Sequence, residues 1–292
     1  MTLGLSERSL AGLLFLATTV SVGGATRDLL AEDPSSENTH VVMASDVQWQ
    51  SLNPNRGDAA PKAGTLWGDQ TEDGESGFLV KFVDGFSSPP HIHNNTYRGV
   101  VIAGGLHNDD PDAEPMWMPV GSYWTQPSGE VHITAARGDS VAYVEIQEGP
   151  YLVQPPSEAF DTGERPVNID ASNLVWLNAS DTSWIEATES SGGNEPKIAF
   201  LWGQPAADQV SGTLVKLPAG FTGKFMTAAS TFRAVVIRGQ LHLHLEGKDK
   251  IAAFVPGSYF GSEGEATHAI ATDEETIVYV RTEGTYRVEA KQ

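Results

Sequence analysis

Three histidines in the first half of the chain have the residue type and spacing of metal ligands. His91 and His93 are separated by a single residue, and His132 follows in a later stretch. Residues i and i+2 of a β-strand point to the same face, so a strand here would aim His91 and His93 into one space. A His-x-His pair alone also fits a solvated strand edge. With His132 added, the pattern favours a divalent metal site (Fe, Zn, Mn, Ni or Cu) formed by His91, His93 and His132.

Glycine and proline residues occur at intervals in the two stretches that carry these histidines, 85–104 and 121–132. Turns are expected at these residues. The spacing resembles the two motifs of the cupin superfamily, G-x5-H-x-H-x3,4-E-x6-G and G-x5-P-x-G-x2-H-x3-N. Eight of the ten fixed positions match: Gly85, His91, His93, Gly104, Gly121, Pro127, Gly129 and His132. Tyr97 replaces the motif's metal-binding Glu, and Ala136 replaces its Asn. The resemblance implies a β-barrel whose metal site has kept its histidines and lost its carboxylate.

Two further side chains are candidates for catalysis at this site. Tyr97 should face the pocket, because it occupies the position of the cupin Glu. Phe232 is its counterpart in the second half, which favours packing; the alternative is a phenol that hydrogen-bonds a ligand. Glu130 lies shortly before His132 and could act as a base or a fourth ligand, although an exposed carboxylate at the pocket rim is the simpler expectation.

The chain contains an internal repeat, and the two copies indicate which segments form the domains that carry the histidines. Leu66-Trp67-Gly68 recurs in the second half as Leu201-Trp202-Gly203, and Gly121-Ser122-Tyr123 recurs as Gly257-Ser258-Tyr259 at nearly the same offset. His132 has a counterpart in His268, but Met226 and Ala228 stand where the first half has His91 and His93. We therefore expect two related domains, of which the second has lost its metal ligands.

Short runs rich in β-branched residues and bounded by turn residues predict an all-β fold, with examples at 78–82, 100–102, 141–144, 213–217, 235–237 and 277–280. The resemblance implies two tandem cupin barrels (double-stranded β-helix or jelly roll), as in bacterial two-cupin proteins. The expected organisation is a signal peptide (1–25), an N-terminal segment (26–39), a metal-binding cupin (40–155), a linker (156–172) and a degenerate cupin (173–292).

The other histidines are expected to serve no metal site. In the run from Leu241 to Glu246, leucines alternate with His242 and His244. The leucines should take the core side and leave the histidines in solvent. A rebuilt site from His242, His244 and Glu246 is the alternative. His107, the counterpart of His242, is expected to be solvated too.

The N-terminal sequence predicts where the protein is located, and the composition restricts the classes of partner that it can bind. Arg8 precedes an apolar run that ends at Gly23-Gly24-Ala25, which predicts export with cleavage after Ala25, to a periplasmic or secreted location. The alternative is an apolar helix that stays as an anchor, although the run is short for a bilayer span. The net charge of −20 argues against nucleic acid and anionic membranes as partners. There is no cysteine, so disulfides and thiolate sites are excluded. The expected partner is a small molecule, with no membrane contact after processing, and a homodimer is left open.

Two functions fit these features. Three neutral histidines leave a metal its full charge for an oxygen ligand of a substrate. Cupins with three histidines include thiol and diketone dioxygenases, so the resemblance implies a metal-dependent oxygenase or hydrolase that acts on a small anionic or chelating substrate. The alternative is a small-molecule or metal-sensing binding protein without turnover.

Overall fold

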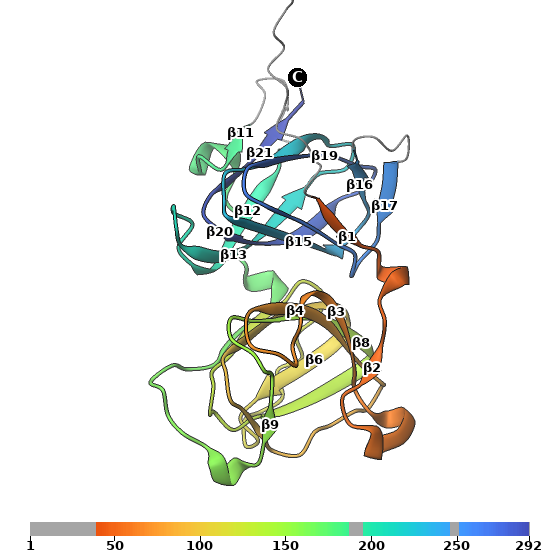
Figure 1. The fold of residues 1–292 in the computed structure, drawn as a ribbon, viewed down its shortest axis with the longest axis vertical. Coiled ribbons are helices and arrows are strands. Elements are labelled where there is room, and N and C mark those ends of the chain that lie inside the picture. Colours follow the sequence, from red (N-terminus) through yellow and green to blue (C-terminus); the bar gives the residue numbers. More distant parts are fainter. Residues whose placement is uncertain (1–38, 187–194, 246–250, 292) are drawn as a thin grey trace, which may run out of the picture. The chain divides into compact units, whose positions relative to one another are not determined.

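The computed structural model describes residues 39–186, 195–245 and 251–291, and nearly all of its regular structure is β-strand, as predicted (Figure 1). The predicted signal peptide, the residues up to 38 and Glu246 lie outside the described residues. The strands of the first half are β2 (Gln50–Ser51), β3 (Lys62–Gly68), β4 (Ser76–Phe82), β5 (Ile92–His93), β6 (Tyr97–Asp109), β7 (Tyr123–Gln126), β8 (Ile133–Ile146) and β9 (Val153–Gln154).

The second half repeats this arrangement. Its strands are β11 (Ile185–Glu186), β12 (Lys197–Gly203), β13 (Val210–Leu217), β14 (Thr222–Thr227), β15 (Thr231–Arg238), β16 (Leu241–His244), β17 (Ile251–Phe254), β18 (Tyr259–Glu263), β19 (Ala266–Thr272), β20 (Thr276–Glu283) and β21 (Tyr286–Ala290). Two leading strands are β1 (His40–Val42) and β10 (Val167–Ile169). The short 3-10 helices are η2 (Ala44–Asp46), η3 (Pro54–Ala59), η4 (Pro156–Glu158), η5 (Ala171–Asn173) and η6 (Ala179–Asp181).

The sheets give each half the layers of a jelly roll. In the first half, seven strands pair in the order β10-β7-β6-β8-β4-β3-β2, and β5 pairs with β9. In the second half, one sheet has the order β1-β18-β15-β20-β13-β12 and the other β11-β21-β14-β19-β16-β17. Strands β6 and β8 are long, and register shifts between Val101 and Gly105 interrupt their pairing. None of the described helices is long and apolar enough to cross a membrane.

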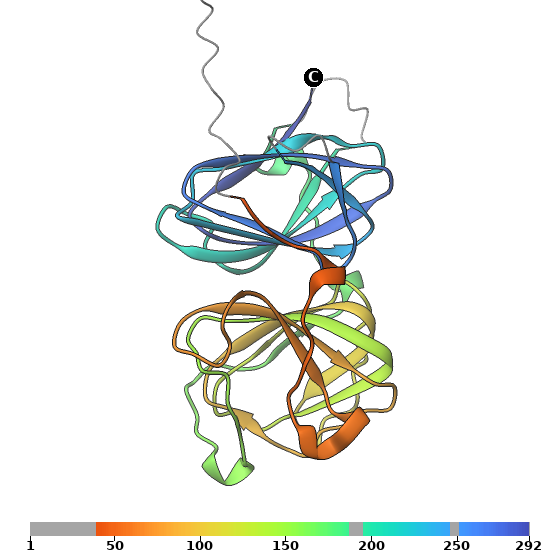
Figure 2. The ribbon, with the colours of Figure 1, turned by 45° about the vertical axis from the view of Figure 1, so that its right-hand side comes forward.

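The two leading strands are exchanged between the halves. Strand β1, orange-red in Figures 1 and 2, lies against the strands of the second half and pairs with β18. Strand β10, within the predicted linker, pairs with β7 of the first half. The following turns are anchored alike. The Ala44 amide donates to Ser258 Oγ at 3.1 Å, and the Ala171 amide donates to Ser122 Oγ at 3.0 Å. Each half is therefore completed by a segment that precedes the other half in the sequence.

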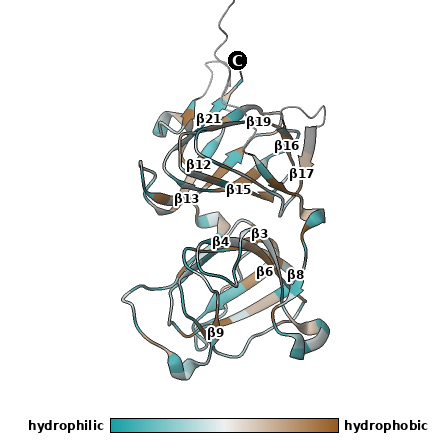
Figure 3. Ribbon diagram, viewed as in Figure 1, coloured by the Kyte–Doolittle hydropathy of each residue, from teal (hydrophilic) through white to brown (hydrophobic). Residues whose placement is uncertain are grey.

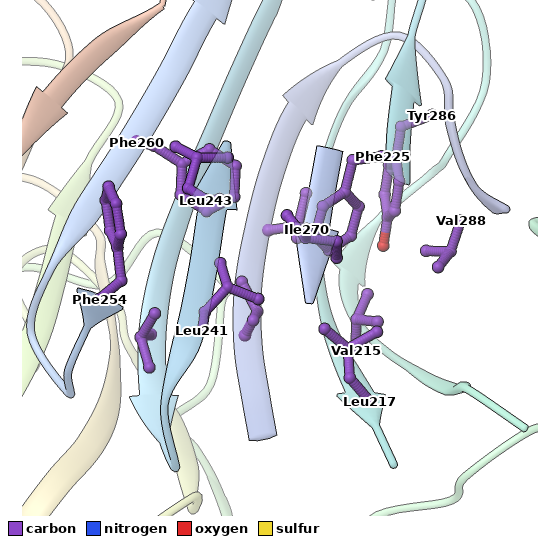
Figure 4. Close-up of a cluster of buried hydrophobic side chains, with 14 of the residues drawn as sticks. Val215, Leu217, Phe225, Leu241, Leu243, Phe254, Phe260, Ile270, Tyr286 and Val288 are labelled. Atoms are coloured by element: carbon purple, nitrogen blue, oxygen red, sulfur yellow. The ribbon is translucent and has the colours of Figure 1, made fainter. Parts of the chain in front are cut away.

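Alternation of apolar residues along the strands builds three cores. One lies in the first half around Phe78 and Val101, one in the second half, and one is shared by both halves through Tyr143 and Tyr279. Hydrophobic colour follows strands such as β15, and hydrophilic colour gathers on the short helical turns (Figure 3). The second half's core is filled by aromatic rings, among them Phe225 beside Tyr286 (Figure 4).

A buried carboxylate organises the contact between the halves. Glu145 is 2% exposed and accepts hydrogen bonds from the hydroxyls of Tyr143 at 3.0 Å and Tyr279 at 2.7 Å. Trp67 and Trp202 donate to these tyrosine hydroxyls at 3.1 and 2.9 Å. The arrangement is pseudosymmetric, because each tyrosine and each tryptophan is the repeat counterpart of the other. Both halves thus donate hydrogen bonds to the same buried carboxyl group.

The remaining histidines confirm one prediction and correct another. On β16, Leu241 and Leu243 are buried and His244 is exposed, as the alternation predicts. His242 is only partly exposed, and its Nε2 lies 2.9 Å from Asp273 Oδ2. The prediction for His107 was wrong, because its side chain is buried and its ring lies 6.1 Å from that of Trp117. The segment around Trp117 covers this face of β6, a non-local contact that alternation along one strand does not reveal.

Candidate metal centre

The three predicted histidines come together in the first half. His93 ends β5, and His91 forms an antiparallel bridge with His132, with 3.0 Å between amide and carbonyl in both directions. Backbone pairing therefore places His91 opposite His132, and alternation places His93 on the same side as His91. The ligand nitrogens of all three rings lie within 4.8 Å of one another.

A glycine of the second motif fixes the approach of these segments. The Gly129 amide donates to the His93 carbonyl at 2.9 Å. Gly129 has a φ of +76°, and a Cβ there would lie 2.3 Å from the Phe160 carbonyl oxygen. A side chain at this position would be strained at this φ and would displace Phe160, so the turn that bonds to His93 requires glycine.

The second ring nitrogen of each histidine is held by a backbone carbonyl. Nδ1 lies 2.9 Å from the Pro89 carbonyl for His91, 2.9 Å from the Leu152 carbonyl for His93, and 3.1 Å from the Glu130 carbonyl for His132. A carbonyl oxygen can only accept, so each Nδ1 carries the proton. The Nε2 lone pairs are left free to bind a metal, which is the usual support of histidine ligands in proteins.

Burial keeps the three rings neutral. Desolvation lowers the pKa of His132 to about 3 and lowers that of His93 well below its ordinary value. The pKa of His91 is also lowered, mainly by burial. Because a metal binds the deprotonated nitrogen, no proton has to be removed at neutral pH before a metal is bound.

Two tyrosine hydroxyls contact the ligand nitrogens. Tyr97 Oη lies 3.1 Å from His132 Nε2 and 2.9 Å from Asn108 Oδ1. Tyr151 Oη lies 3.1 Å from His93 Nε2, and its ring stacks on that of His93 at 4.2 Å between centroids. Burial raises the pKa of both phenols, so both remain protonated donors. Tyr97 also packs in the first core, as expected for its position.

Sequence reasoning missed Tyr151, although the repeat carried a signal for it. Glu148-Gly149-Pro150-Tyr151 recurs in the second half as Glu283-Gly284-Thr285-Tyr286, so a tyrosine follows the last long strand of each half. In the second half, Tyr286 is buried among the aromatic rings of the core.

The structure does not bring the carboxylate of Glu130 into the pocket. Its Oε1 lies 3.3 Å from Nη1 of Arg165, a residue within the predicted linker, and Glu130 is not among the residues that line the pocket. No carboxylate therefore lies among the pocket-lining residues in the described part of the chain.

The histidines open onto an apolar pocket of about 250 Å³. Its walls include Val80, Phe82, Phe86, Trp124 and Val153, and the lining also contains His91, His93, Tyr97 and Tyr151. Of the residues near the second motif, Trp124 lines the pocket, whereas Met116 and Trp117 do not.

The corresponding place in the second half is packed with aromatic rings. His268 Nε2 lies 3.1 Å from Ser262 Oγ, and its ring stacks on that of Phe232 at 5.2 Å. Met226 and Ala228 supply no ligands. Within residues 39–186, 195–245 and 251–291, the group in the first half is the one cluster with metal-ligand geometry.

Comparison with known proteins gives the same fold. The family model described as domain of unknown function DUF4437 matches residues 40–289. A Nostoc punctiforme protein provisionally described as a dioxygenase superimposes with a TM-score of 0.62 at 15% identity, covering 90% of each chain. Protein Ylba from E. coli, of family DUF861, gives 0.56 at 13%, covering 89% of this chain and 97% of its own.

A salicylate 1,2-dioxygenase from Pseudaminobacter salicylatoxidans gives a TM-score of 0.51 at 12% identity, covering 88% of this chain and 87% of its own. None of the curated proteins matches the sequence significantly. The similar structures have the cupin fold, so this chain has the two-barrel cupin fold, and its three-histidine cluster supports a bound metal ion.

Proposed function

The chain belongs to the DUF4437 family, and from its site we propose a metal-dependent oxygenase or hydrolase that acts on a small anionic or chelating substrate. The observation that carries this proposal is the orientation of His91, His93 and His132. Their Nδ1 atoms face backbone carbonyls and their Nε2 atoms converge beside an apolar pocket. Such a set of neutral ligands suits Fe, Zn, Mn, Ni or Cu.

A divalent metal held there would supply a Lewis acid with its full positive charge and open positions for substrate. The protein would supply binding and orientation. Phe82, Phe86 and Trp124 give the pocket apolar walls, and a substrate that filled it would displace water and so strengthen polar interactions at the histidines.

The two phenols would orient the substrate by hydrogen bonding. Once a metal occupies the Nε2 lone pairs, Tyr97 keeps Asn108 Oδ1 as an acceptor, but Tyr151 loses its His93 partner. The Tyr151 hydroxyl, which also interacts with that of Tyr97, would then be able to donate to a substrate oxygen. Tyr97 and Tyr151, rather than Glu130, are therefore the groups that we assign to the substrate.

A second candidate function is a ligand-binding or sensing protein without turnover. The observation that favours it is the lack of a carboxylate among the described residues that line the pocket, which leaves no carboxylate there to act as a general base.

The two functions differ in a measurable way. Metal-free protein reloaded with Fe(II) or Zn(II) is offered small carboxylates, phenols and diketones, while oxygen uptake and products are followed by electrode and mass spectrometry. The proposed enzyme gives metal-dependent turnover that His93→Ala abolishes. Binding without turnover under every metal would support the second candidate, and equal turnover by His93→Ala would exclude the site.

A further inference from the structure

One arginine, Arg56, lies in the wall of the pocket beside the histidines. Among the described residues that line it, Arg56 is the one lysine or arginine. It lies on η3, where its amide donates to the Asn53 carbonyl at 3.0 Å and the Asn53 side chain accepts from the Asn55 amide at 3.2 Å. This turn lies outside the cupin motifs, and its hydrogen bonds fix the point from which Arg56 reaches the pocket.

The guanidinium of Arg56 lies over an aromatic ring and has no acidic partner among the described residues. Its Cζ lies 5.1 Å from the centroid of Phe86, which also lines the pocket. Arg165, Arg233 and Arg281 form ion pairs, whereas no such pair involves Arg56 in the described part of the chain. The chain has 38 acidic and only 18 basic residues, so most arginines can find a carboxylate. An arginine that faces a pocket without a carboxylate is therefore available to an acidic ligand.

Arg56 faces the same space as the histidines. Both Arg56 and His91 are among the residues that line the pocket. The two side chains therefore share one cavity, although they come from separate segments of the sequence.

The remaining lining defines the other part of the ligand. Leu52, Val80, Phe82, Trp124 and Val153 form an apolar wall, and Asn53, Ser88, Asn108 and Thr134 add polar groups without charge. A dry cavity of roughly 150 Å³ accommodates benzene. The volume of about 250 Å³ here leaves room for one ring and a short acidic side chain.

We propose that this pocket binds a monocarboxylic acid with an apolar body of one ring, and that Arg56 binds its carboxylate. The guanidinium fork matches a carboxylate with two parallel hydrogen bonds. The ring lies against Phe82 and Trp124, with its far edge toward the histidines. This inference rests on the proposed function, because the acid is the class of substrate that the metal site would act on.

Calorimetric titration with phenylacetate and 3-phenylpropionate tests the proposal, with phenylacetamide as the neutral probe. Wild type, Arg56→Gln and Arg56→Lys are compared, and Arg137→Gln is the matched control, because Arg137 is exposed and lies over Trp117 outside the pocket. Loss of charge-assisted hydrogen bonds corresponds to about 10- to 100-fold in Kd. We expect that loss for both acids in Arg56→Gln and a smaller loss in Arg56→Lys. Arg137→Gln should bind like wild type, and phenylacetamide should show no loss in any variant.

Each titration is repeated on metal-free and metal-loaded protein. Binding of the acids that survives metal removal and fails in Arg56→Gln supports the proposal, even if the protein shows no turnover. Binding that disappears with the metal and persists in Arg56→Gln would place the carboxylate on the metal and overturn it. Failure of wild type to bind either acid would overturn it as well. A failure of the proposed function appears separately, as a chain that takes up no metal.

Discussion

The Tyr97 hydroxyl lies between a metal-ligand nitrogen and an amide network. Asn108 Oδ1 accepts from Tyr97 at 2.9 Å and from Thr134 at 2.8 Å, and Asn108 Nδ2 donates to Gln126 at 3.0 Å. The ring itself is buried against Trp124. The ring therefore supports packing, and the hydroxyl completes a network that survives without it through Thr134.

Tyr97→Phe should leave the metal content unchanged, because it keeps the ring and removes no ligand. Its free energy of unfolding should fall by about 1 kcal/mol, the usual cost of one hydrogen bond. Urea denaturation and elemental analysis check this. A variant that lost its metal would show that the phenol is itself a ligand. If a substrate is found, a large fall in the turnover of metal-loaded Tyr97→Phe would show that the phenol takes part in catalysis.

The histidines of the site could be predicted because their relation is local in each motif. His91 and His93 share a strand face, and the motif spacing supplies His132. Tyr151 was missed because its approach to His93 depends on the path of the chain after β8. The position of Glu130 depends on Arg165, which the sequence gives no reason to place beside it.

At the scale of elements, strand β19 carries a histidine that the second half keeps neutral. His268 is 2% exposed, and burial lowers its pKa from 6.5 to about 4. Between these values the unfolded state binds the proton and the folded state does not. The stability from this group is therefore fully present above about pH 6.5 and is lost as the pH falls toward 4.

His268→Phe should remove that part of the pH dependence. From pH 7 to pH 4, the free energy of unfolding of wild type should fall by on the order of 3 kcal/mol more than that of the variant. Denaturation curves across this pH range, with both proteins free of metal, measure the difference. Parallel curves for the two proteins would mean that His268 is protonated in the folded state.

Strands were predictable from alternation and turn residues, but their partners were not. The runs at 78–82 and 213–217 match β4 and β13. The exchange of β1 and β10 joins segments that lie far apart in the sequence, and no local pattern encodes such pairings. The prediction that His107 is solvated was wrong for the same reason, because the residues that cover it come from another segment.

At the scale of the whole molecule, the halves are joined through the buried Glu145. Burial raises its pKa, and the positive charge of Arg281 opposes that rise. Glu145→Leu would leave the hydroxyls of Tyr143 and Tyr279 without their acceptor and Arg281 with Glu75 as its ion-pair partner.

Glu145→Leu should therefore lower the free energy of unfolding by about 3 kcal/mol, as for other broken buried charge networks. Glu186→Gln is the matched control, because its pair with Arg287 is exposed and such pairs contribute roughly 0–1 kcal/mol. Guanidinium denaturation measures both. An effect of Glu145→Leu no larger than that of the control would show that the halves do not depend on this carboxylate.

Export is a prediction for the whole chain that depends on its N-terminal segment, from Met1 to Ala25. N-terminal sequencing of the protein from its native host should find a mature chain that begins at Thr26. Soluble protein that retains Met1 would contradict a periplasmic or secreted location.

The metal content of three purified proteins tests the central claim most directly. Wild type should hold about one divalent ion per chain, because one half retains three converging histidines and the other retains only His268. His132→Ala should lose the ion, since two ligands cannot complete the site, and His268→Ala should keep it. Elemental analysis that finds full metal in His132→Ala, or two ions in wild type with one lost in His268→Ala, would contradict this assignment.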